Sequence, residues 1–391
     1  MEEIIYVDRR GTNCHKWDSP KKMYQRDDIL PMSIADMDFK VPDCVQQALK
    51  DHIEMGVLGY SAPPEEYYQS FLNWEQNYHN VAVEKEWIRF IPGVVTGIAW
   101  LLEQVTVPGD TGIILSPVYG PFSGMLRQHD VNIVSCELKN NRGVYSIDFD
   151  DFEAKIIENH VKVFLLCSPH NPVGRVWRKE ELCRLVEICQ RHSVFIIADE
   201  IHQDIIMPGH EHISILSLVE DKEQVAMLTS TAKSFNLAGI KNAFMIVPNE
   251  TLRKKIDAVQ QGSAIRGGNS LGYTAVAAAY AHGRPWLEAV CDQICKNFLY
   301  AQDRLKMELP ALQISPLEGT FLMWVDFGAY LQPGEDPQRM LVEQQGLLLN
   351  SGSFFGGDPY RQFVRINLAT SMENVISAVD RIVSLFKDRN T

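Results

Sequence analysis

The sequence predicts an α/β fold with a mainly parallel sheet, followed by a smaller α+β domain. In the middle of the chain, short apolar runs rich in Val, Ile and Leu alternate with amphipathic stretches. Near-continuous apolar runs are typical of strands that are covered on both faces, as in parallel sheets. Alternating β and α elements imply right-handed crossovers between these strands. In the last third of the chain, long helical patterns replace this alternation.

Six apolar runs of the middle region are expected to be strands. They cover residues 111–115, 132–136, 161–167, 194–198, 226–229 and 243–247. Residues 179–191 lie between two of these runs and predict an amphipathic helix, because their apolar side chains recur at helical spacing. These side chains are Leu182, Leu185, Val186 and Cys189.

The C-terminal third predicts a long helix over residues 285–308, which Pro310 ends. Two strands and a last helix follow, over residues 321–327, 362–368 and 372–387. This pattern suits a small α+β domain against which the N-terminal segment packs. We therefore expect a large domain over residues 45–284 and a small domain that combines residues 1–44 with residues 285–391.

Composition and charge exclude several classes of function. The chain has 391 residues, of which 46% are hydrophobic and 22% charged, as in ordinary globular proteins. The net charge of −13 argues against sequence-independent binding to nucleic acid. The acidic start at Glu2 and Glu3 does not indicate a signal peptide, and the longest apolar stretch, residues 274–281, is too short to span a bilayer. We expect a cytoplasmic protein with neither nucleic acid nor membrane as a partner.

The eight cysteines show no C-x-x-C spacing. Cys183 and Cys189 are six residues apart, and Cys291 and Cys295 could share one face of a helix. In a chain without an export signal, these residues are expected to be buried, reduced thiols. The sequence predicts no metal site.

Lys233 and Asp199 are the most informative pair of polar residues. Asp199 ends an apolar run, and Lys233 follows the next predicted strand. A lysine that can form a Schiff base and an aspartate that can hold a pyridinium proton are the groups that pyridoxal 5′-phosphate (PLP) requires from a protein. A carboxylate at a buried strand end is costly unless it is paired, and a pyridinium N–H would pair it. The alternative is that Asp199 caps a helix.

Three segments could bind a phosphate. Gly93 lies in a turn that leads into a predicted helix, whose first backbone N–H groups would face an anion. An ordinary helix start explains the same pattern. Ser230 could hold a phosphate while Lys233 reaches an aldehyde. Lys241 could add positive charge, although a solvent-exposed lysine is the simpler explanation.

Two further side chains follow predicted strands. Tyr119 lies in a sharp turn after residues 111–115, where ligands of open α/β sheets bind, and could cover a flat ring. A surface tyrosine is the alternative. Asn171 lies between Pro169 and Pro172, which make the turn rigid and would preorganise its amide as a donor.

Arg365 lies on a strand that is otherwise apolar, over residues 362–368. A guanidinium in such a place requires a planar anionic partner, and the carboxylate of an amino acid matches its fork. An internal salt bridge is the alternative.

Taken together, these motifs resemble the fold-type I PLP enzymes related to aspartate aminotransferase. The motifs are SPHNP at residues 168–172, DEIH at 199–202, STAK at 230–233, and Arg365. A further set resembles the cystathionine β-lyase and C–S lyase branch, with its MalY-like and PatB-like members. That set is IADMDF at residues 34–39, DEIH, and KSFNLAG at 233–239. The resemblance covers essentially the whole chain and implies a seven-stranded, mainly parallel sheet in the large domain.

The resemblance implies roles around the cofactor ring. Lys233 would bind PLP covalently, Asp199 would pair with the pyridine nitrogen, and Asn171 would bond the ring hydroxyl. Tyr119 would stack on the ring. His202 stands where related aminotransferases commonly have a tyrosine near the ring hydroxyl, which agrees with the lyase branch.

The resemblance also implies a phosphate site shared between subunits. Ser230 and the backbone at Val94 and Val95 would hold the phosphate. Lys241 stands where related aminotransferases commonly have an arginine, and a lysine lacks the forked geometry of that residue. Tyr60 matches a tyrosine that family members present to the phosphate of the neighbouring subunit, which implies a homodimer.

On the substrate side, the resemblance implies that Arg365 binds the carboxylate of an amino acid, beside Ala35 and Tyr119. The expected activity is a C–S β-lyase that cleaves L-cystathionine or other cysteine S-conjugates to a thiol, pyruvate and ammonia. Two alternatives remain. The same residues support an aminotransferase, and a regulatory binding protein could retain PLP without turnover.

Overall fold

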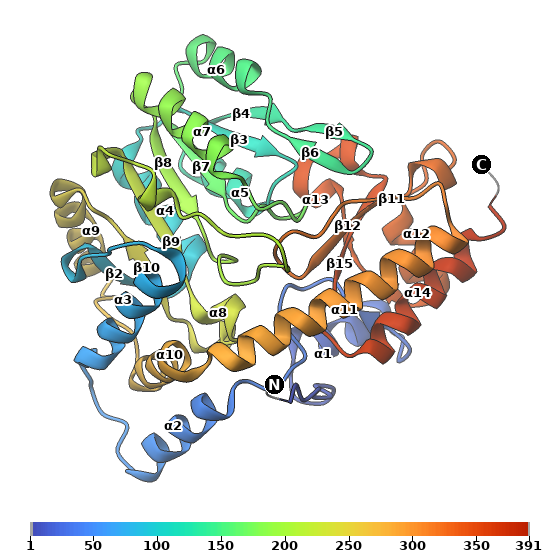
Figure 1. Ribbon diagram of the computed structural model, residues 1–391, viewed down its shortest axis with the longest axis horizontal. Helices are drawn as coiled ribbons and strands as arrows, with labels where there is room; N and C mark the ends of the chain where they lie inside the picture. Colours follow the sequence, from blue (N-terminus) through green and yellow to red (C-terminus); the bar gives the residue numbers. More distant parts are fainter. Residues whose placement is uncertain (1–2, 390–391) are drawn as a thin grey trace.

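The computed structural model describes residues 3–389 and places a seven-stranded sheet beside a smaller four-stranded sheet (Figure 1). The strands of the large sheet, in spatial order, are β2 (Ile88–Ile91), β10 (Ala243–Ile246), β9 (Val225–Thr229), β8 (Phe195–Asp199), β7 (Val163–Cys167), β3 (Thr111–Ser116) and β4 (Asn132–Glu137). The pairs from β9 through β4 are parallel, whereas β10 is antiparallel to both of its neighbours. The prediction of a mainly parallel sheet is confirmed.

The large sheet is buried on both faces, which explains its continuous apolar runs. Along β7, Phe164 and Leu166 join one apolar cluster, whereas Val163 and Leu165 join another. Helices α4 (Val94–Val105), α5 (Pro121–Gln128) and α9 (Glu250–Gly262) cover one face. The other face packs on α3 (Glu65–His79), α6 (Phe149–Glu158), α7 (Lys179–Arg191) and α10 (Ser270–His282), and α2 (Asp43–Glu54) packs on α10.

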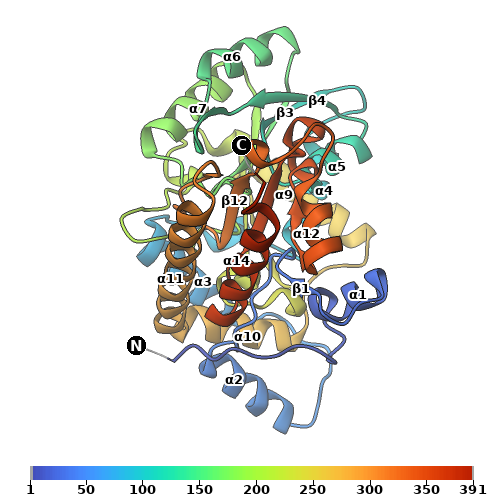
Figure 2. The same ribbon diagram turned by 90° about the vertical axis from the view of Figure 1, so that its right-hand side faces the viewer.

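The small sheet is antiparallel and belongs to the C-terminal third. Its strands, in spatial order, are β11 (Gln313–Ile314), β12 (Leu322–Asp326), β15 (Phe363–Asn367) and β14 (Asn350–Ser351). Three helices accompany it, α11 (Arg284–Glu308), α12 (Pro337–Gln345) and α14 (Met372–Phe386). Helix α11 runs from the end of α10 across the small sheet, and α14 lies beside it (Figure 2).

The N-terminal segment contains α1 (His15–Tyr24) and β1 (Leu30–Pro31). Strand β1 pairs in parallel with β13 (Leu347–Leu348), so this segment joins the C-terminal third. The expected domain limits themselves, residues 45–284 against 1–44 and 285–391, remain a prediction. Among the helices of residues 3–389, none has the length and apolar character that a bilayer span requires.

All predicted strands and helices of the middle and C-terminal regions are present, with ends that differ by one or two residues. Several helices were not predicted, and the strand missing from the predicted large sheet is β2, whose run is interrupted by Arg89. This side chain is accommodated because it forms an ion pair of 2.5 Å with Asp257 of α9. The charge of Arg89 within this strand is therefore balanced by a carboxylate 168 positions later in the sequence.

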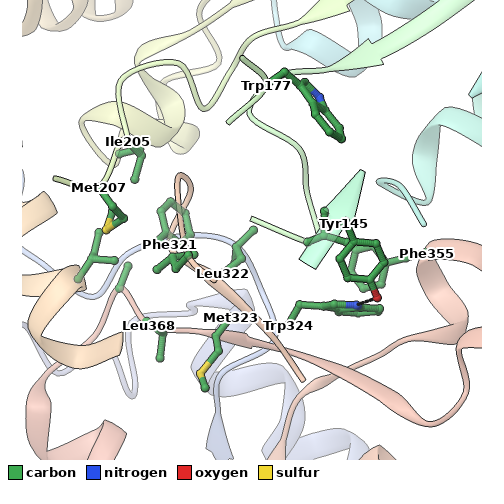
Figure 3. Packing of buried hydrophobic residues seen from close by; sticks show 14 of the residues in the cluster. Tyr145, Trp177, Ile205, Met207, Phe321, Leu322, Met323, Trp324, Phe355 and Leu368 are labelled. Carbon is green, nitrogen blue, oxygen red and sulfur yellow. Dashed lines mark hydrogen bonds between the residues drawn. The ribbon is translucent and has the colours of Figure 1, made fainter. Parts of the chain in front are cut away.

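Aromatic packing connects the two sheets (Figure 3). Trp324 of β12 donates a hydrogen bond of 3.0 Å to the hydroxyl of Tyr145, which lies on β6 (Val144–Ser146). Strand β6 pairs with β5 (Lys139–Asn141) as a hairpin at the edge of the large domain. Trp324 also stacks on Phe363, with ring centroids 5.0 Å apart. The bond between Trp324 and Tyr145 thus joins the small sheet to the β5–β6 hairpin.

Candidate functional site

A cavity of about 470 Å³ lies at the carboxyl ends of the parallel strands, where open α/β sheets bind their ligands. The predicted site residues come from separate elements and meet in its wall. Those that line the cavity are Ala35, Val94, Val95, Tyr119, Asn171, Asp199, His202, Ser230, Lys233, Lys241 and Arg365. Tyr60 is the exception among the predicted residues.

Lys233 lies on α8 (Thr231–Ser234), a short helix directly after β9. Ser230 caps this helix, because its hydroxyl accepts a hydrogen bond of 3.0 Å from the backbone N–H of Ala232. The Lys233 amine donates a hydrogen bond of 2.5 Å to the carbonyl of Ala35. Burial and the nearby Arg365 lower the pKa of Lys233 to about 8, against the opposing effect of two carboxylates. A lysine with this pKa provides an appreciable fraction of free amine near neutral pH.

Asp199 ends β8 and is 5% exposed. One carboxylate oxygen accepts a hydrogen bond of 3.1 Å from the backbone N–H of Ile201. Burial raises the pKa of Asp199 to about 7, although this backbone bond and the charge of Lys233 favour the ionised form. A cationic N–H in the cavity would stabilise the ionised carboxylate.

His202 follows on the same turn and is 3% exposed. Its Nδ1 atom has no hydrogen-bond partner within residues 3–389. Burial, together with the charges of Lys233 and Arg365, lowers the pKa of His202, so the imidazole is neutral. An unsatisfied buried ring nitrogen in the cavity wall fits a ligand with polar groups.

The N-terminus of α4 forms an anion site in the cavity wall. Gly93 precedes the helix, and no side chain caps its first N–H groups. Val94 and Val95 therefore present backbone donors at the positive end of the helix dipole. Lys241 is exposed at the edge of the same cavity, and Ser230 also lines it. The N–H groups and Lys241 fit a phosphate group, whereas the Ser230 hydroxyl donates a hydrogen bond of 2.8 Å to the Asn242 carbonyl.

Arg365 projects from β15 and is 3% exposed. Its guanidinium donates hydrogen bonds to the Asn171 side-chain oxygen at 3.0 Å, the Ser33 carbonyl at 2.8 Å and the Asn350 side-chain oxygen at 3.2 Å. It also lies over the Phe355 ring at 4.9 Å.

All of these partners of Arg365 are neutral, and the ion pairs found within residues 3–389 do not include it. The alternative of an internal salt bridge is therefore wrong. Burial without an anion lowers the pKa of Arg365 to about 10, and its Nε has no partner in the described chain. A buried guanidinium in this state is suited to bind an anionic group of a ligand.

Tyr119 lines the cavity after β3 and is only partly exposed, so it is not an ordinary surface tyrosine. Burial is the main reason that its pKa is raised. The hydrogen bonding of Asn171 is compatible with its predicted role as a donor. Its amide oxygen accepts from Arg365, which leaves the amide N–H₂ group as the part that could donate to a ligand.

Sequence reasoning missed several residues of the cavity wall. Among them are Phe354, which is 49% exposed, and Asn350, which holds Arg365. Both lie in a short irregular region around β14 and α13 (Ser353–Gly356). That region has no periodic pattern and no charged motif that would have pointed to a site.

Tyr60 lies outside the cavity and is fully exposed. It ends a stretch of exposed apolar side chains that includes Ile53, Met55, Val57 and Leu58. No other part of residues 3–389 covers these side chains. A contiguous exposed apolar stretch of this kind is typical of an interaction surface.

Comparison with known proteins identifies the family. The model of the aminotransferase class I and II family matches residues 27–382. The chain belongs to this family. It is 36% identical over 377 residues to cystathionine β-lyase PatB of Bacillus subtilis, covering 96% of this chain and 97% of the relative. It is 29% identical to protein MalY of Escherichia coli, covering 97% of each.

Solved structures of aminotransferase class I and II relatives confirm the predicted fold type I. The chain superposes on cystalysin from Treponema denticola, which contains PLP, with a TM-score of 0.93 at 32% identity and 98% coverage of each chain. It superposes on the PLP-bound C–S lyase from Staphylococcus hominis with a TM-score of 0.92 at 31% identity, covering 98% of this chain and 97% of that one. The resemblance to the cystathionine β-lyase and C–S lyase branch is also confirmed.

Proposed function

We propose that this protein is a PLP-dependent C–S β-lyase that cleaves L-cystathionine or other cysteine S-conjugates to a thiol, pyruvate and ammonia. The observation that carries the proposal is the buried Arg365 guanidinium without an anionic partner, in one cavity with Lys233 and Asp199. Relatives that bear the names cystathionine β-lyase and C–S lyase, at 36% and 31% identity, support the same activity.

The cavity wall provides groups for each part of PLP. We assign the phosphate to the N-terminus of α4, whose first N–H groups are uncapped, with Lys241 as a nearby cation and Ser230 in the same cavity wall. We assign the ring nitrogen to Asp199, whose buried carboxylate is stabilised by a cationic N–H. Tyr119 would cover the ring, and Lys233 would attach to the aldehyde.

When bound, PLP accepts the electron pair left at Cα of an amino acid, which allows a thiolate on the β-carbon to leave. Arg365 binds the substrate carboxylate through its fork and thereby places the Cα proton near Lys233. The Lys233 amine removes this proton, since its lowered pKa makes it a competent base near neutral pH. Asp199 stays ionised and keeps negative charge opposite the ring nitrogen.

An aminotransferase is the second candidate, and two observations favour it. The matching family model describes class I and II aminotransferases. The chain also superposes on a PLP-bound putative aminotransferase from Clostridium difficile 630 with a TM-score of 0.94 at 35% identity, over 98% of each chain. In that reaction the Lys233 amine would move the Cα proton to the cofactor, and no thiolate would leave the β-carbon.

The exposed stretch over residues 53–60 supports a homodimer in which Tyr60 completes the site of the partner subunit. The exposed apolar side chains of this stretch are typical of an interface. A second copy of the chain, related by two-fold symmetry, would bury them. The acidic net charge and the absence of a spanning helix within residues 3–389 are consistent with our proposal of a cytoplasmic enzyme.

The decisive experiment incubates the PLP-loaded protein with L-cystathionine and follows pyruvate, free thiol and the cofactor spectrum. Release of pyruvate and thiol over many turnovers, abolished in Lys233→Ala, is the expected result. Conversion of the cofactor to its amine form without pyruvate, reversed by a 2-oxo acid, would establish the aminotransferase instead. Lys254→Ala is the matched control, because Lys254 is 73% exposed and pairs only with Glu250 on the surface.

A further inference from the structure

The segment over residues 33–37 connects two of the cationic groups of the cavity, Arg365 and Lys233. The carbonyl of Ser33 accepts a hydrogen bond of 2.8 Å from Arg365, and the carbonyl of Ala35 accepts the bond of 2.5 Å from Lys233. The position of this segment therefore decides where the Lys233 amine can rest. The segment has no regular secondary structure over these residues, so side chains from elsewhere must hold it.

Asn367 provides the central part of this support. It lies on β15 two residues after Arg365 and is 0% exposed. Its Nδ2 donates to the carbonyls of Ile34 at 2.6 Å and Asp36 at 2.7 Å, one on each side of Ala35. Its Oδ1 accepts a hydrogen bond of 2.8 Å from the backbone of Ala369. Every hydrogen-bonding atom of this buried amide is thus engaged.

Other contacts hold the end of the segment at Asp36 and Met37, and within it the Asp36 N–H donates a hydrogen bond of 3.0 Å to the Ile34 carbonyl. Asn236, three residues after Lys233, accepts from the Met37 backbone N–H at 3.1 Å and donates to the Met37 carbonyl at 3.1 Å. Arg9 forms an ion pair of 2.7 Å with the Asp36 carboxylate.

We propose that Asn367 is a positioning residue, which aims the Ala35 carbonyl at the Lys233 amine and so determines where this amine rests when it is not bonded to PLP. A carbonyl acceptor stabilises the ammonium form, and donation of one N–H also orients the amine. The inference rests on the proposed function, because the free amine is the form that removes the Cα proton. The charged groups that act on Lys233 are Arg365, Asp36 and Asp199, and the substitution of Asn367 removes none of these charges.

The test compares Asn367→Ala with Asn297→Ala. Asn297 is also 0% exposed, and its Nδ2 donates to two carbonyls, Leu368 and Thr370, at 2.8 Å each. It therefore controls for the loss of a buried amide that contacts no part of residues 33–37. The full-length chain, freed of cofactor, is reacted with trinitrobenzenesulfonate between pH 6 and pH 10, and labelling of Lys233 is measured by peptide mass spectrometry.

We expect the midpoint of Lys233 labelling to fall by about one pH unit in Asn367→Ala, because the ammonium loses its acceptor. Labelling at pH 7 then increases about fivefold, because the free-amine fraction rises from about a tenth to about a half, whereas Asn297→Ala keeps the wild-type midpoint. In the PLP-loaded protein, kcat for L-cystathionine falls while KM is unchanged, since Arg365 still binds the carboxylate.

An unchanged midpoint in a folded Asn367→Ala protein would overturn the inference, as would an equal shift in Asn297→Ala. If Asn367→Ala does not fold, Asn367→Ser retains one donor and is expected to give a shift of the same sign. The labelling result does not depend on the reaction catalysed. If the wild-type protein has no lyase activity, the proposed function is refuted. The labelling experiment would still test where the Lys233 amine rests.

Discussion

Arg365 donates a hydrogen bond of 3.0 Å to the side-chain oxygen of Asn171 across 194 residues of sequence. Arg365 belongs to the small sheet, whereas Asn171 follows β7 of the large sheet. The bond therefore joins the two sheets across the cavity and holds the proposed carboxylate-binding group in the same cavity as Lys233 and Asp199. Any movement of one sheet relative to the other changes the geometry of this site.

Replacement of Lys233 by alanine is expected to reduce pyruvate formation from L-cystathionine by about 10²- to 10⁴-fold, the range associated with loss of a positioned acid–base group. The Lys233 side chain is both the proposed attachment point and the proposed base. The measurement is the initial rate of pyruvate release with PLP in excess. A rate within twofold of wild type would contradict the role of Lys233.

Arg365→Lys is expected to raise KM for L-cystathionine by about 10²-fold, because a lysine is a point charge that cannot form the forked pair with a carboxylate. The substitution keeps the positive charge, so a change in KM reports the loss of the forked guanidinium geometry. Steady-state kinetics over a range of substrate concentrations provides the measurement. Arg339→Lys, at a side chain that is 74% exposed, is the control and should leave KM unchanged.

The raised pKa of Asp199 predicts how the stability of the cofactor-free chain depends on pH. Its pKa is about 7 when folded and 3.8 ordinarily, so the folded chain binds more protons than the unfolded chain between these values. The free energy of unfolding therefore falls as the pH rises from about 4 to about 7. Asp199→Asn removes this cost and is expected to stabilise the cofactor-free chain at pH 8 by up to about 4 kcal/mol.

Urea unfolding of wild type and Asp199→Asn at pH 4, 6 and 8 measures this difference. Equal stability of the two chains at pH 8 would contradict the buried, unpaired state of the carboxylate. In the PLP-loaded protein, the same substitution should lower kcat, because no carboxylate then keeps the ring nitrogen protonated.

A homodimer with shared sites predicts complementation between two inactive variants. Tyr60→Ala damages the site of the partner subunit, whereas Lys233→Ala damages the site of its own subunit. When the two variants are mixed, unfolded and refolded together, half of the dimers are hybrids with one intact site, and about a quarter of wild-type activity returns. Mixing without refolding is the control, and no recovery after refolding would contradict the shared site.

Trp324→Ala is expected to reduce the free energy of unfolding by about 3–5 kcal/mol, because it removes a fully buried indole. The indole is 1% exposed, stacks on Phe363 and donates to Tyr145 (Figure 3). Chemical denaturation monitored by circular dichroism measures the change. Val144→Ala, next to Tyr145 and 52% exposed, should change stability by less than about 0.5 kcal/mol.

Much of the fold follows from local sequence pattern. The apolar runs of β7, β8 and β9 predict buried parallel strands because each run must be covered on both faces, and the two apolar clusters provide that cover. Strand β2 escaped prediction because Arg89 interrupts its apolar run, and the partner of this charge, Asp257, comes from a distant helix. Local pattern cannot report a partner of this kind.

The candidate site, like the fold, contains residues that the sequence predicts and residues that it does not. Motifs that follow strand ends, such as those of Asp199 and Lys233, were predicted to lie together because carboxyl ends of parallel strands meet at one edge of a sheet. The contributions of Phe354 and Asn350 were missed because they come from irregular chain near the small sheet. The positions of Phe354 and Asn350 depend on how the small sheet packs against the large domain.

By itself, the sequence determined which segments become strands and helices and which residue types stand at their ends, since these depend on the periodicity of apolar side chains and on local turn chemistry. Only the tertiary structure decided that Arg365 has neutral partners, that Asn367 holds the carbonyls on both sides of Ala35, and that Tyr60 is exposed. The physical reason is that hydrogen bonds and burial are set by residues brought together from up to about 330 positions apart. Such contacts depend on the packing of the two sheets, which no local pattern encodes.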